Sequence, residues 1–198
     1  MTKLLFLPGA GASAHFWRPV SDKLLPERPR RLFAWPGLGD EPPQPNVRGV
    51  DDLVSMVLGE MAEPVDLIAQ SMGGYVAIKV ALAAPERVRR LVLTGTSAGL
   101  PMASLGAAEW RHNYRAQHPG AAAWITEVRE DLTEQLRTIG AATLLLWGDR
   151  DAISPVAVGR RLAELLPRAV LRVALGGDHD FPQTHADLIT PWIAEHLA

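Results

Sequence analysis

The chain has 198 residues, 47% of them hydrophobic, and a formal net charge of −2 at pH 7. This length and composition predict a single domain, residues 1–198, with a sizeable core. Acidic and basic residues are interspersed, which gives no sign of a nucleic-acid partner or a membrane surface. The lack of cysteine excludes disulfides, a thiol nucleophile and a cysteine metal site. Without a signal-peptide pattern or a run of transmembrane length, the expected location is the cytoplasm.

Short apolar runs alternate with helical patterns along most of the chain. We expect strands at residues 3–7, 31–35, 65–69, 89–93, 142–147 and 170–174. Helices are expected at about 17–25, 51–61, 72–84 and 155–166, and from residue 185 onward. Strands separated by helices predict a doubly wound, mostly parallel α/β sheet of about six strands.

Residues 98–141 break this alternation. Their pattern predicts two helices, at about 102–117 and 121–139, separated by His118-Pro119-Gly120. Trp110, Tyr114 and Trp124 give the segment an apolar surface. We expect most of this surface to pack against the rest of the chain, with Trp110 and Trp124 also candidates for lining a substrate pocket.

The stretch from Val65 to Ile78 organises the chain. It reads as a buried strand, a corner at Gln70-Ser71-Met72 and a helix rich in small residues. A serine at a sharp strand-to-helix corner is typical of a nucleophile elbow, in which strained backbone geometry exposes the hydroxyl. The positions two before and two after it must be small, and here they are Ala69 and Gly73. The alternative is an ordinary Ser-Met-Gly-Gly turn.

This stretch resembles the elbow of the α/β-hydrolase fold, whose usual pattern is Gly-x-Ser-x-Gly, with Ala69 replacing the first glycine. The resemblance covers nearly the whole chain. It implies that residues 98–141 form a short helical cap inserted in the domain. It also implies a full sheet of eight strands, so the antiparallel edge hairpin that begins the fold is expected to be missing here.

The loop after the first strand is Pro8-Gly9-Ala10-Gly11-Ala12-Ser13. Similar enzymes carry a His-Gly loop here, and the next residue gives a backbone N–H to the oxyanion hole. The resemblance therefore implies that Ala10 and Met72 supply the two oxyanion donors. Gly9 and Gly11 give the loop its conformational freedom and would adjoin the substrate. A phosphate cradle is the alternative, but the loop lacks the Gly-Lys-Ser/Thr ending of a P-loop.

A serine nucleophile needs a base, and the base needs an anionic partner. In this fold the order along the chain is serine, acid, histidine, and Ser71, Asp151 and His179 follow it. Asp149 competes for the role of the acid. We favour Asp151, because it has the family's Gly-x-x-Asp spacing from Gly148, whereas Asp149 suits a turn.

The leading hypothesis is a cofactor-independent serine hydrolase that acts on a small ester, thioester or lactone. No metal-binding pattern such as His-Glu-x-x-His is present in the sequence. A lyase resembling those of menaquinone synthesis, or another non-hydrolytic enzyme on the same triad, stays open. A non-catalytic binding protein of this fold is a further alternative. Assembly into a homodimer also stays open. The expected partner is a small-molecule substrate.

Overall fold

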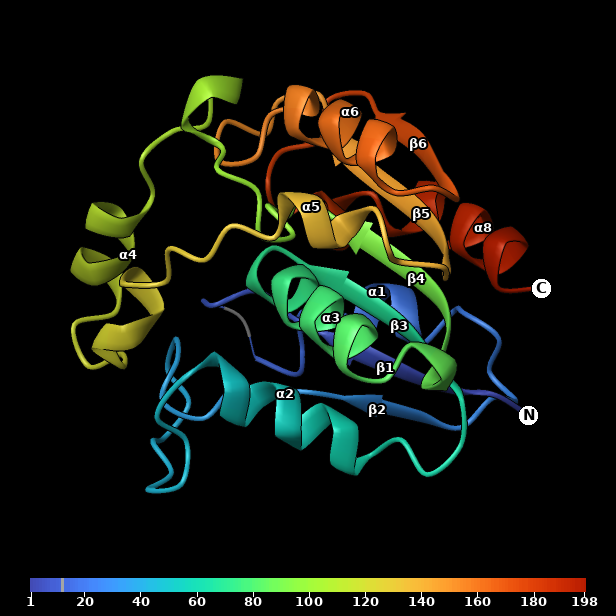
Figure 1. Cartoon of the computed structure of the whole chain (residues 1–198), viewed down its shortest axis with the longest axis horizontal. Coiled ribbons are helices and arrows are strands. Elements are labelled where there is room, and N and C mark those ends of the chain that lie inside the picture. Colours follow the sequence, from blue (N-terminus) through green and yellow to red (C-terminus); the bar gives the residue numbers. More distant parts are fainter. Residues whose placement is uncertain (12) are drawn as a thin grey trace.

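A computed structural model of the chain describes residues 1–11 and 13–198. Within these residues six strands form one sheet in the order β2-β1-β3-β4-β5-β6, and each neighbouring pair is parallel (Figure 1). The strands are β1 (Lys3–Leu7), β2 (Arg30–Leu32), β3 (Val65–Gln70), β4 (Val88–Thr94), β5 (Ala142–Gly148) and β6 (Ala169–Ala174). The predicted α/β class and the sheet of six strands are confirmed, but the second strand, predicted at 31–35, covers only Arg30–Leu32.

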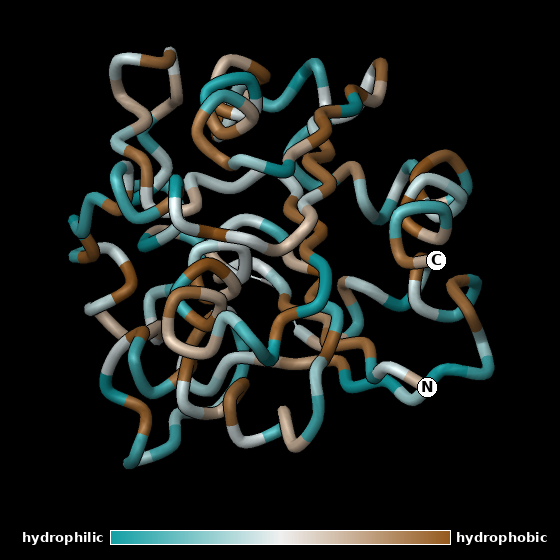
Figure 2. Tube along the Cα trace, turned by 45° about the vertical axis from the view of Figure 1, so that its right-hand side comes forward, coloured by the Kyte–Doolittle hydropathy of each residue, from teal (hydrophilic) through white to brown (hydrophobic). Residues whose placement is uncertain are grey.

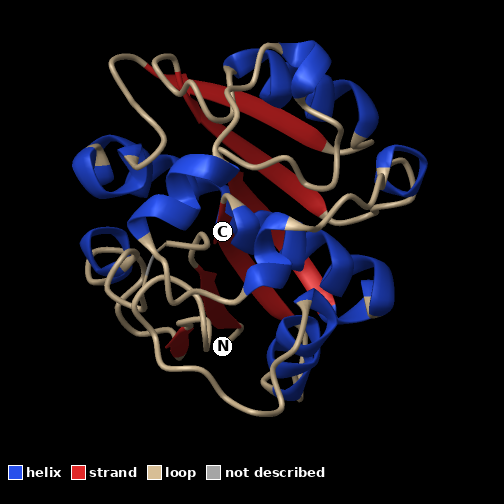
Figure 3. Ribbon diagram, turned by 90° about the vertical axis from the view of Figure 1, so that its left-hand side faces the viewer, coloured by secondary structure: helices blue, strands red, loops and turns tan. Residues whose placement is uncertain are grey.

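Helices cover both faces of the sheet (Figure 3). One face is covered by α2 (Val50–Gly59), α3 (Met72–Ala83), α5 (Thr133–Leu136) and α6 (Val156–Leu165). The other is covered by α1 (Arg18–Ser21), α7 (Phe181–Thr184) and α8 (Ala186–Leu197). The 3-10 helix η1 (Pro85–Arg87) joins α3 to β4. A sheet covered on both faces explains why its strands read as continuous apolar runs rather than as alternating ones.

Successive residues of each strand fill the two core layers in turn. In β1, Leu5 and Leu7 belong to the layer under α2 and α3, whereas Leu4 and Phe6 belong to the layer under α1 and α8. The hydrophobic residues therefore concentrate along the strands in the middle of the molecule (Figure 2). Burial of both strand faces stabilises the sheet by about 25 cal/mol per Å² of apolar surface. It also fixes the strand register, because a slip of one residue would exchange the two layers.

One charge lies inside the sheet. Asp66 of β3 is fully buried, and its carboxylate accepts hydrogen bonds from Arg28 Nη2 at 2.5 Å and from Arg89 Nε at 2.9 Å and Nη2 at 2.6 Å. A buried carboxylate without such partners would cost several kcal/mol. Segments far apart in the sequence are thus joined at the amino-terminal edge of the central strand.

The segment between β4 and β5 contains short helices where two longer ones are predicted. They are η2 (Ala103–Leu105), α4 (Arg111–Gln117), η3 (Ala123–Thr126) and α5. The predicted helices 102–117 and 121–139 are therefore wrong in extent. Gly106 ends the first turn with a φ of 82°, and Ala108 N–H donates to Ala152 O at 2.8 Å instead of continuing a helix.

The second predicted cap helix is interrupted at Asp131. Its carboxylate accepts hydrogen bonds from both the backbone N–H and the hydroxyl of Thr133, and such local bonds compete with helical ones. Two positions of the segment meet where Leu132 N–H donates to Gly99 O at 3.0 Å. Between them, α4 lies beyond the carboxyl ends of the strands (Figure 1). No described helix combines the length and the apolar character that a bilayer span requires.

Candidate active site

Ser71 sits at the corner between β3 and α3. Its backbone has φ 52° and ψ −120°. Residues other than glycine rarely adopt this region, which costs on the order of 1–3 kcal/mol. Three backbone hydrogen bonds hold the corner: Ser71 N–H donates to Thr94 O at 2.9 Å, and Ser71 O accepts from the N–H groups of Gly74 at 2.9 Å and Tyr75 at 3.4 Å. The hydroxyl therefore leaves the sheet at the start of α3, where helix N–H groups favour negative charge.

The corner is tightly packed where the start of α3 approaches the end of β1. A Cβ at Gly73 would lie 2.4 Å from Leu7 O and 2.5 Å from Pro8 O, so β1 and α3 almost touch there. Ala69, two residues before the serine, is fully buried in the sheet and has room for its methyl group. The structure therefore requires glycine two positions after the serine and accepts alanine two positions before it.

The structure brings together the three side chains predicted to act as nucleophile, base and acid. His179 Nε2 lies 3.0 Å from Ser71 Oγ, and His179 Nδ1 lies 2.8 Å from Asp151 Oδ2. Ser71, Asp151 and His179 follow the carboxyl ends of β3, β5 and β6, the sheet edge at which open α/β folds place their sites. Asp151 is buried, whereas the hydroxyl-bearing Ser71 is partly exposed.

The two competing aspartates have different environments. Asp151 Oδ1 accepts the backbone N–H groups of Ile153 and Ser154 at 2.9 and 2.8 Å, which leaves Oδ2 directed at the imidazole. Asp149 is exposed, and its Oδ1 accepts Gly176 N–H at 2.6 Å. Asp151 thus contacts the histidine, and Asp149 joins the loops after β5 and β6.

Two further residues shape the site and were not singled out from the sequence. A Cβ at Gly95 would lie 2.9 Å from Asp151 Oδ2 and 3.4 Å from His179 Nδ1, so the pair lies against bare backbone. Gln70 is buried, and its Nε2 donates to the carbonyl of His179 at 3.2 Å. The available sequence signal for Gly95 was a glycine at the end of the neighbouring strand. No local sequence signal pointed to Gln70.

The two predicted oxyanion donors come from two different segments of the chain. Ala10 is in the loop after β1 and Met72 begins α3. Neither backbone N–H donates a hydrogen bond to any acceptor among the described residues. Gly9 packs directly on the corner, because a Cβ there would lie 3.2 Å from Ser71 Cβ and 2.3 Å from Gln70 Oε1. Ala12, in the same predicted loop, lies outside the described residues.

The remaining pocket candidates belong to residues 98–141, the predicted cap, or touch them. Gly11 lies under α4, where a Cβ would be 3.3 Å from His118 Nε2. Trp110 is half-buried at the start of α4, with its ring 5.8 Å from that of Tyr114. Trp124 of η3 packs on the larger core layer, and its buried Nε1 has no acceptor among the described residues. Contact of Trp110 and Trp124 with a substrate stays a prediction.

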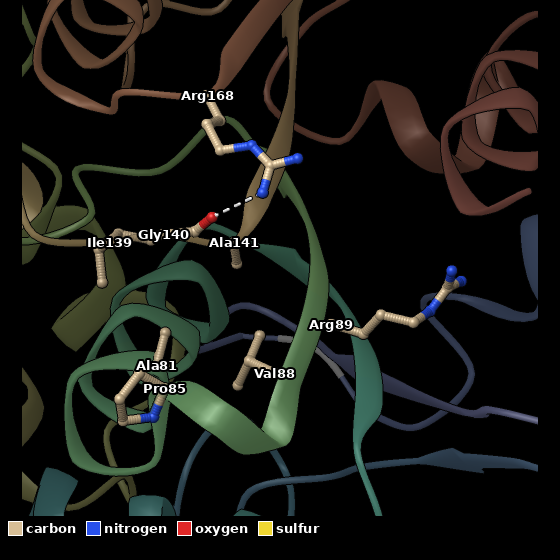
Figure 4. Close-up of a pocket in the computed structure, with 8 residues that line it drawn as sticks. All are labelled: Ala81, Pro85, Val88, Arg89, Ile139, Gly140, Ala141 and Arg168. Atoms are coloured by element: carbon tan, nitrogen blue, oxygen red, sulfur yellow. Dashed lines mark hydrogen bonds between the residues drawn. The ribbon is translucent and has the colours of Figure 1, made fainter.

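Two cavities lie away from this arrangement. One of about 210 Å³ is at the amino-terminal ends of β4 and β5, where Arg168 Nη1 donates to Gly140 O at 3.2 Å (Figure 4). The other, of about 270 Å³, is on the cap between Arg111, Arg115 and Arg129. Among the described residues no three His, Asp or Glu side chains are grouped to hold a metal ion.

The chain is similar to several curated proteins. It is 31% identical over 96 residues to a pimeloyl-[acyl-carrier protein] methyl ester esterase of Pectobacterium carotovorum subsp. carotovorum, a match covering 48% of this chain and 37% of that esterase. It is also 29% identical over 240 residues to the 2-hydroxymuconate semialdehyde hydrolase of Pseudomonas sp. strain CF600, covering 96% of this chain and 83% of that protein. The chain thus spans well under half of the esterase's length.

Similar folds occur among solved structures. A meta-cleavage product hydrolase from Pseudomonas fluorescens IP01 superimposes with a TM-score of 0.80 at 22% identity, covering 100% of this chain and 90% of the hydrolase. The sequence model described as the alpha/beta hydrolase family matches residues 4–190. On this match and on its fold, the chain belongs to the alpha/beta hydrolase family.

Proposed function

We propose that this protein is a cofactor-independent serine hydrolase that cleaves a small carboxylic ester, thioester or lactone. The observation that carries the proposal is the continuous series of contacts from Ser71 Oγ through His179 to Asp151, at 3.0 and 2.8 Å. A hydroxyl on a strained corner, joined to an imidazole that is joined to a buried carboxylate, is the arrangement that activates a serine at neutral pH.

Each group has one task in the proposed reaction. Ser71 Oγ attacks the carbonyl carbon while His179 Nε2 takes its proton, and Asp151 holds the imidazole in the required tautomer. The N–H groups of Ala10 and Met72 stabilise the negative charge that develops on the carbonyl oxygen. His179 then gives the proton to the leaving group. In the second half His179 Nε2 takes a proton from water while the water oxygen attacks the acyl carbon, and it then gives that proton to Ser71 Oγ as the bond between Ser71 and the acyl group breaks.

The names of two relatives support this reaction class: one is an esterase of a methyl ester and the other is a hydrolase. The segment between β4 and β5 contains helices of three to seven residues, so we propose a shallow pocket beside Ala10 and Met72. Such a pocket should accept various short acyl groups and change the activation free energy by about 1–3 kcal/mol per methylene at most.

The test is a panel of p-nitrophenyl esters from acetyl to dodecanoyl, run beside Ser71→Ala as the control. Turnover of short esters by the wild type alone would support the proposal. No turnover of any ester would shift weight to a lyase or a binding protein. A sharp optimum at long chains would show a deep tunnel and overturn the shallow pocket.

A further inference from the structure

Tyr114 of the cap makes two hydrogen bonds to the edge of the sheet. Its hydroxyl donates to Ala10 O at 3.1 Å and accepts from Gly39 N–H at 3.1 Å. Ala10 follows β1, Gly39 follows β2, and Tyr114 is on α4, so a single oxygen atom joins three separate segments. The neighbouring loops also touch each other, because a Cβ at Gly39 would lie 3.0 Å from Gly11 O.

Side chains from different parts of the molecule hold carbonyls at the end of β1 and in the loop that follows it. Trp17 Nε1 donates to Leu7 O at 3.1 Å, and Trp35 Nε1 donates to Pro8 O at 2.7 Å. Both tryptophans are buried among the elements that cover the sheet. In the described part of the loop, Tyr114 provides the third such bond and the one that comes from the cap. The first part of the loop is therefore held by the core, and Ala10 by α4.

Ala10 needs this support because of its neighbours. Gly9 and Gly11 have wide backbone freedom, so their own conformational preferences do not fix the orientation of the Ala10 N–H. A bond to the Ala10 carbonyl restricts the backbone on the other side of the same Cα atom. Oxyanion stabilisation depends on donors that are already oriented before charge develops.

Tyr114 itself is rigidly held. It is 8% exposed, and its ring lies between those of Trp110 and His118, at centroid distances of 5.8 and 5.0 Å. Burial raises the pKa of the Tyr114 hydroxyl, which therefore keeps its proton and its role as a donor at neutral pH.

We infer that Tyr114 is a positioning residue of the oxyanion hole: it holds the Ala10 backbone in the orientation that presents its N–H to the substrate oxygen. This inference rests on the proposed hydrolase function. Its consequence is that the cap completes the catalytic machinery. When α4 moves away from the loop, one of the two oxyanion donors loses its orientation.

The experiment compares Tyr114→Phe with Tyr75→Phe. The chain has two tyrosines, and both join the cap to the rest of the molecule. Tyr75, on α3, hydrogen-bonds through its hydroxyl to Glu130 and makes no bond to the described part of the loop. Both substitutions keep the ring and remove one buried hydroxyl, so any general effect of loosening the cap appears in both. Melting temperatures verify that both variants fold.

Tyr114→Phe should lower kcat for p-nitrophenyl acetate by about tenfold or more, less than the 10²–10³ that follows complete loss of a donor. KM should change little, and inhibition by an alkylboronic acid, which mimics the tetrahedral intermediate, should weaken as much as kcat falls. Tyr75→Phe should keep both kcat and boronate inhibition near the wild type. Equal losses in the two variants, or a loss in KM alone, would overturn the inference.

A second measurement does not depend on activity. Amide hydrogen exchange over residues 4–11 should be faster in Tyr114→Phe than in the wild type and in Tyr75→Phe, and unchanged exchange would overturn the inference. If the wild type neither hydrolyses esters nor reacts with a fluorophosphonate, the proposed function fails. The exchange result then still decides whether Tyr114 anchors the loop.

Discussion

At the scale of single residues, the hydroxyl of Ser71 can be removed without relieving the strain around it. Alanine would have to adopt the same positive φ of 52°, so Ser71→Ala isolates the chemistry from the fold. We expect this variant to lose ester hydrolysis while its melting temperature stays nearly unchanged. A fluorophosphonate should label Ser71 in the wild type, as mass spectrometry of its peptides can show. Label on Ser13 or Ser97 would contradict the assignment.

The two aspartates after β5 give a matched pair of substitutions. Asp151→Asn should lower kcat by about 10⁴, because an amide beside His179 Nδ1 favours the wrong tautomer. Asp149→Asn should cost far less, since the amide oxygen can still accept Gly176 N–H. Steady-state kinetics on the same ester measure both effects. A larger loss of kcat in Asp149→Asn than in Asp151→Asn would show that Asp149, and not Asp151, is the acid of the triad.

The candidate triad could be predicted from the sequence, because chain order and spacing after strands place Ser71, Asp151 and His179 at one edge of a parallel sheet. The residues that support it could not. Gln70 reaches the carbonyl of His179, which is 109 positions away, and Tyr114 reaches Ala10 across 104. Such contacts depend on how the loops close over the sheet, and local pattern carries no signal for that.

At the scale of the secondary-structure elements, α3 can cross close to β1 because Gly73 has no side chain. Gly73→Ala would put a methyl group 2.4 Å from the Leu7 carbonyl, so α3 must shift. The expected cost is about 1–3 kcal/mol or more, as in other overpacked cores, together with a loss of activity. Gly59→Ala in α2 is the control, because a Cβ there meets nothing within 4 Å, and it should be neutral or stabilising. Urea unfolding of both variants tests this, and a Gly73→Ala protein as stable as the wild type would contradict it.

Element type was more predictable than element extent. The strands and the helices that cover the sheet have apolar periodicity, which the core enforces over several turns. The cap has less of it, and bonds to other segments, such as that from Ala108 to Ala152, replace the helical ones that the pattern predicted. Asp66 is a related case, because its partners Arg28 and Arg89 become visible only once three segments are assembled.

At the scale of the whole molecule, stability should depend on pH through His196. Burial, and then the charge of Arg90, lower the pKa of this histidine below its ordinary 6.5. The unfolded chain therefore binds a proton near pH 6 that the folded chain resists, and stability falls as the pH drops below the ordinary value. The part of the folding stability that depends on His196 is fully present above pH 6.5, the ordinary pKa of histidine.

Urea unfolding between pH 8 and pH 5 measures this dependence. His196→Gln should give a shallower fall in the free energy of unfolding than the wild type. The same change at the exposed His112 is the matched control. Identical slopes for the wild type and His196→Gln would exclude His196 as the titrating group.

The hydrogen bond from Leu132 to Gly99 gives the cap the character of an exchangeable module. Gly99 and Leu132 meet, so the roughly thirty residues between them form a closed excursion, which bonds back to other segments through contacts such as that of Ala108 with Ala152. Lengthening such an excursion is cheap, about 0.6 kcal/mol for each doubling. Recombination at two positions would therefore exchange the segment and leave the strands and the elbow intact, provided that the new segment also bonds to the Ala10 carbonyl as Tyr114 does. New substrate preferences would then arise by replacing a whole segment rather than by accumulating point changes around the serine.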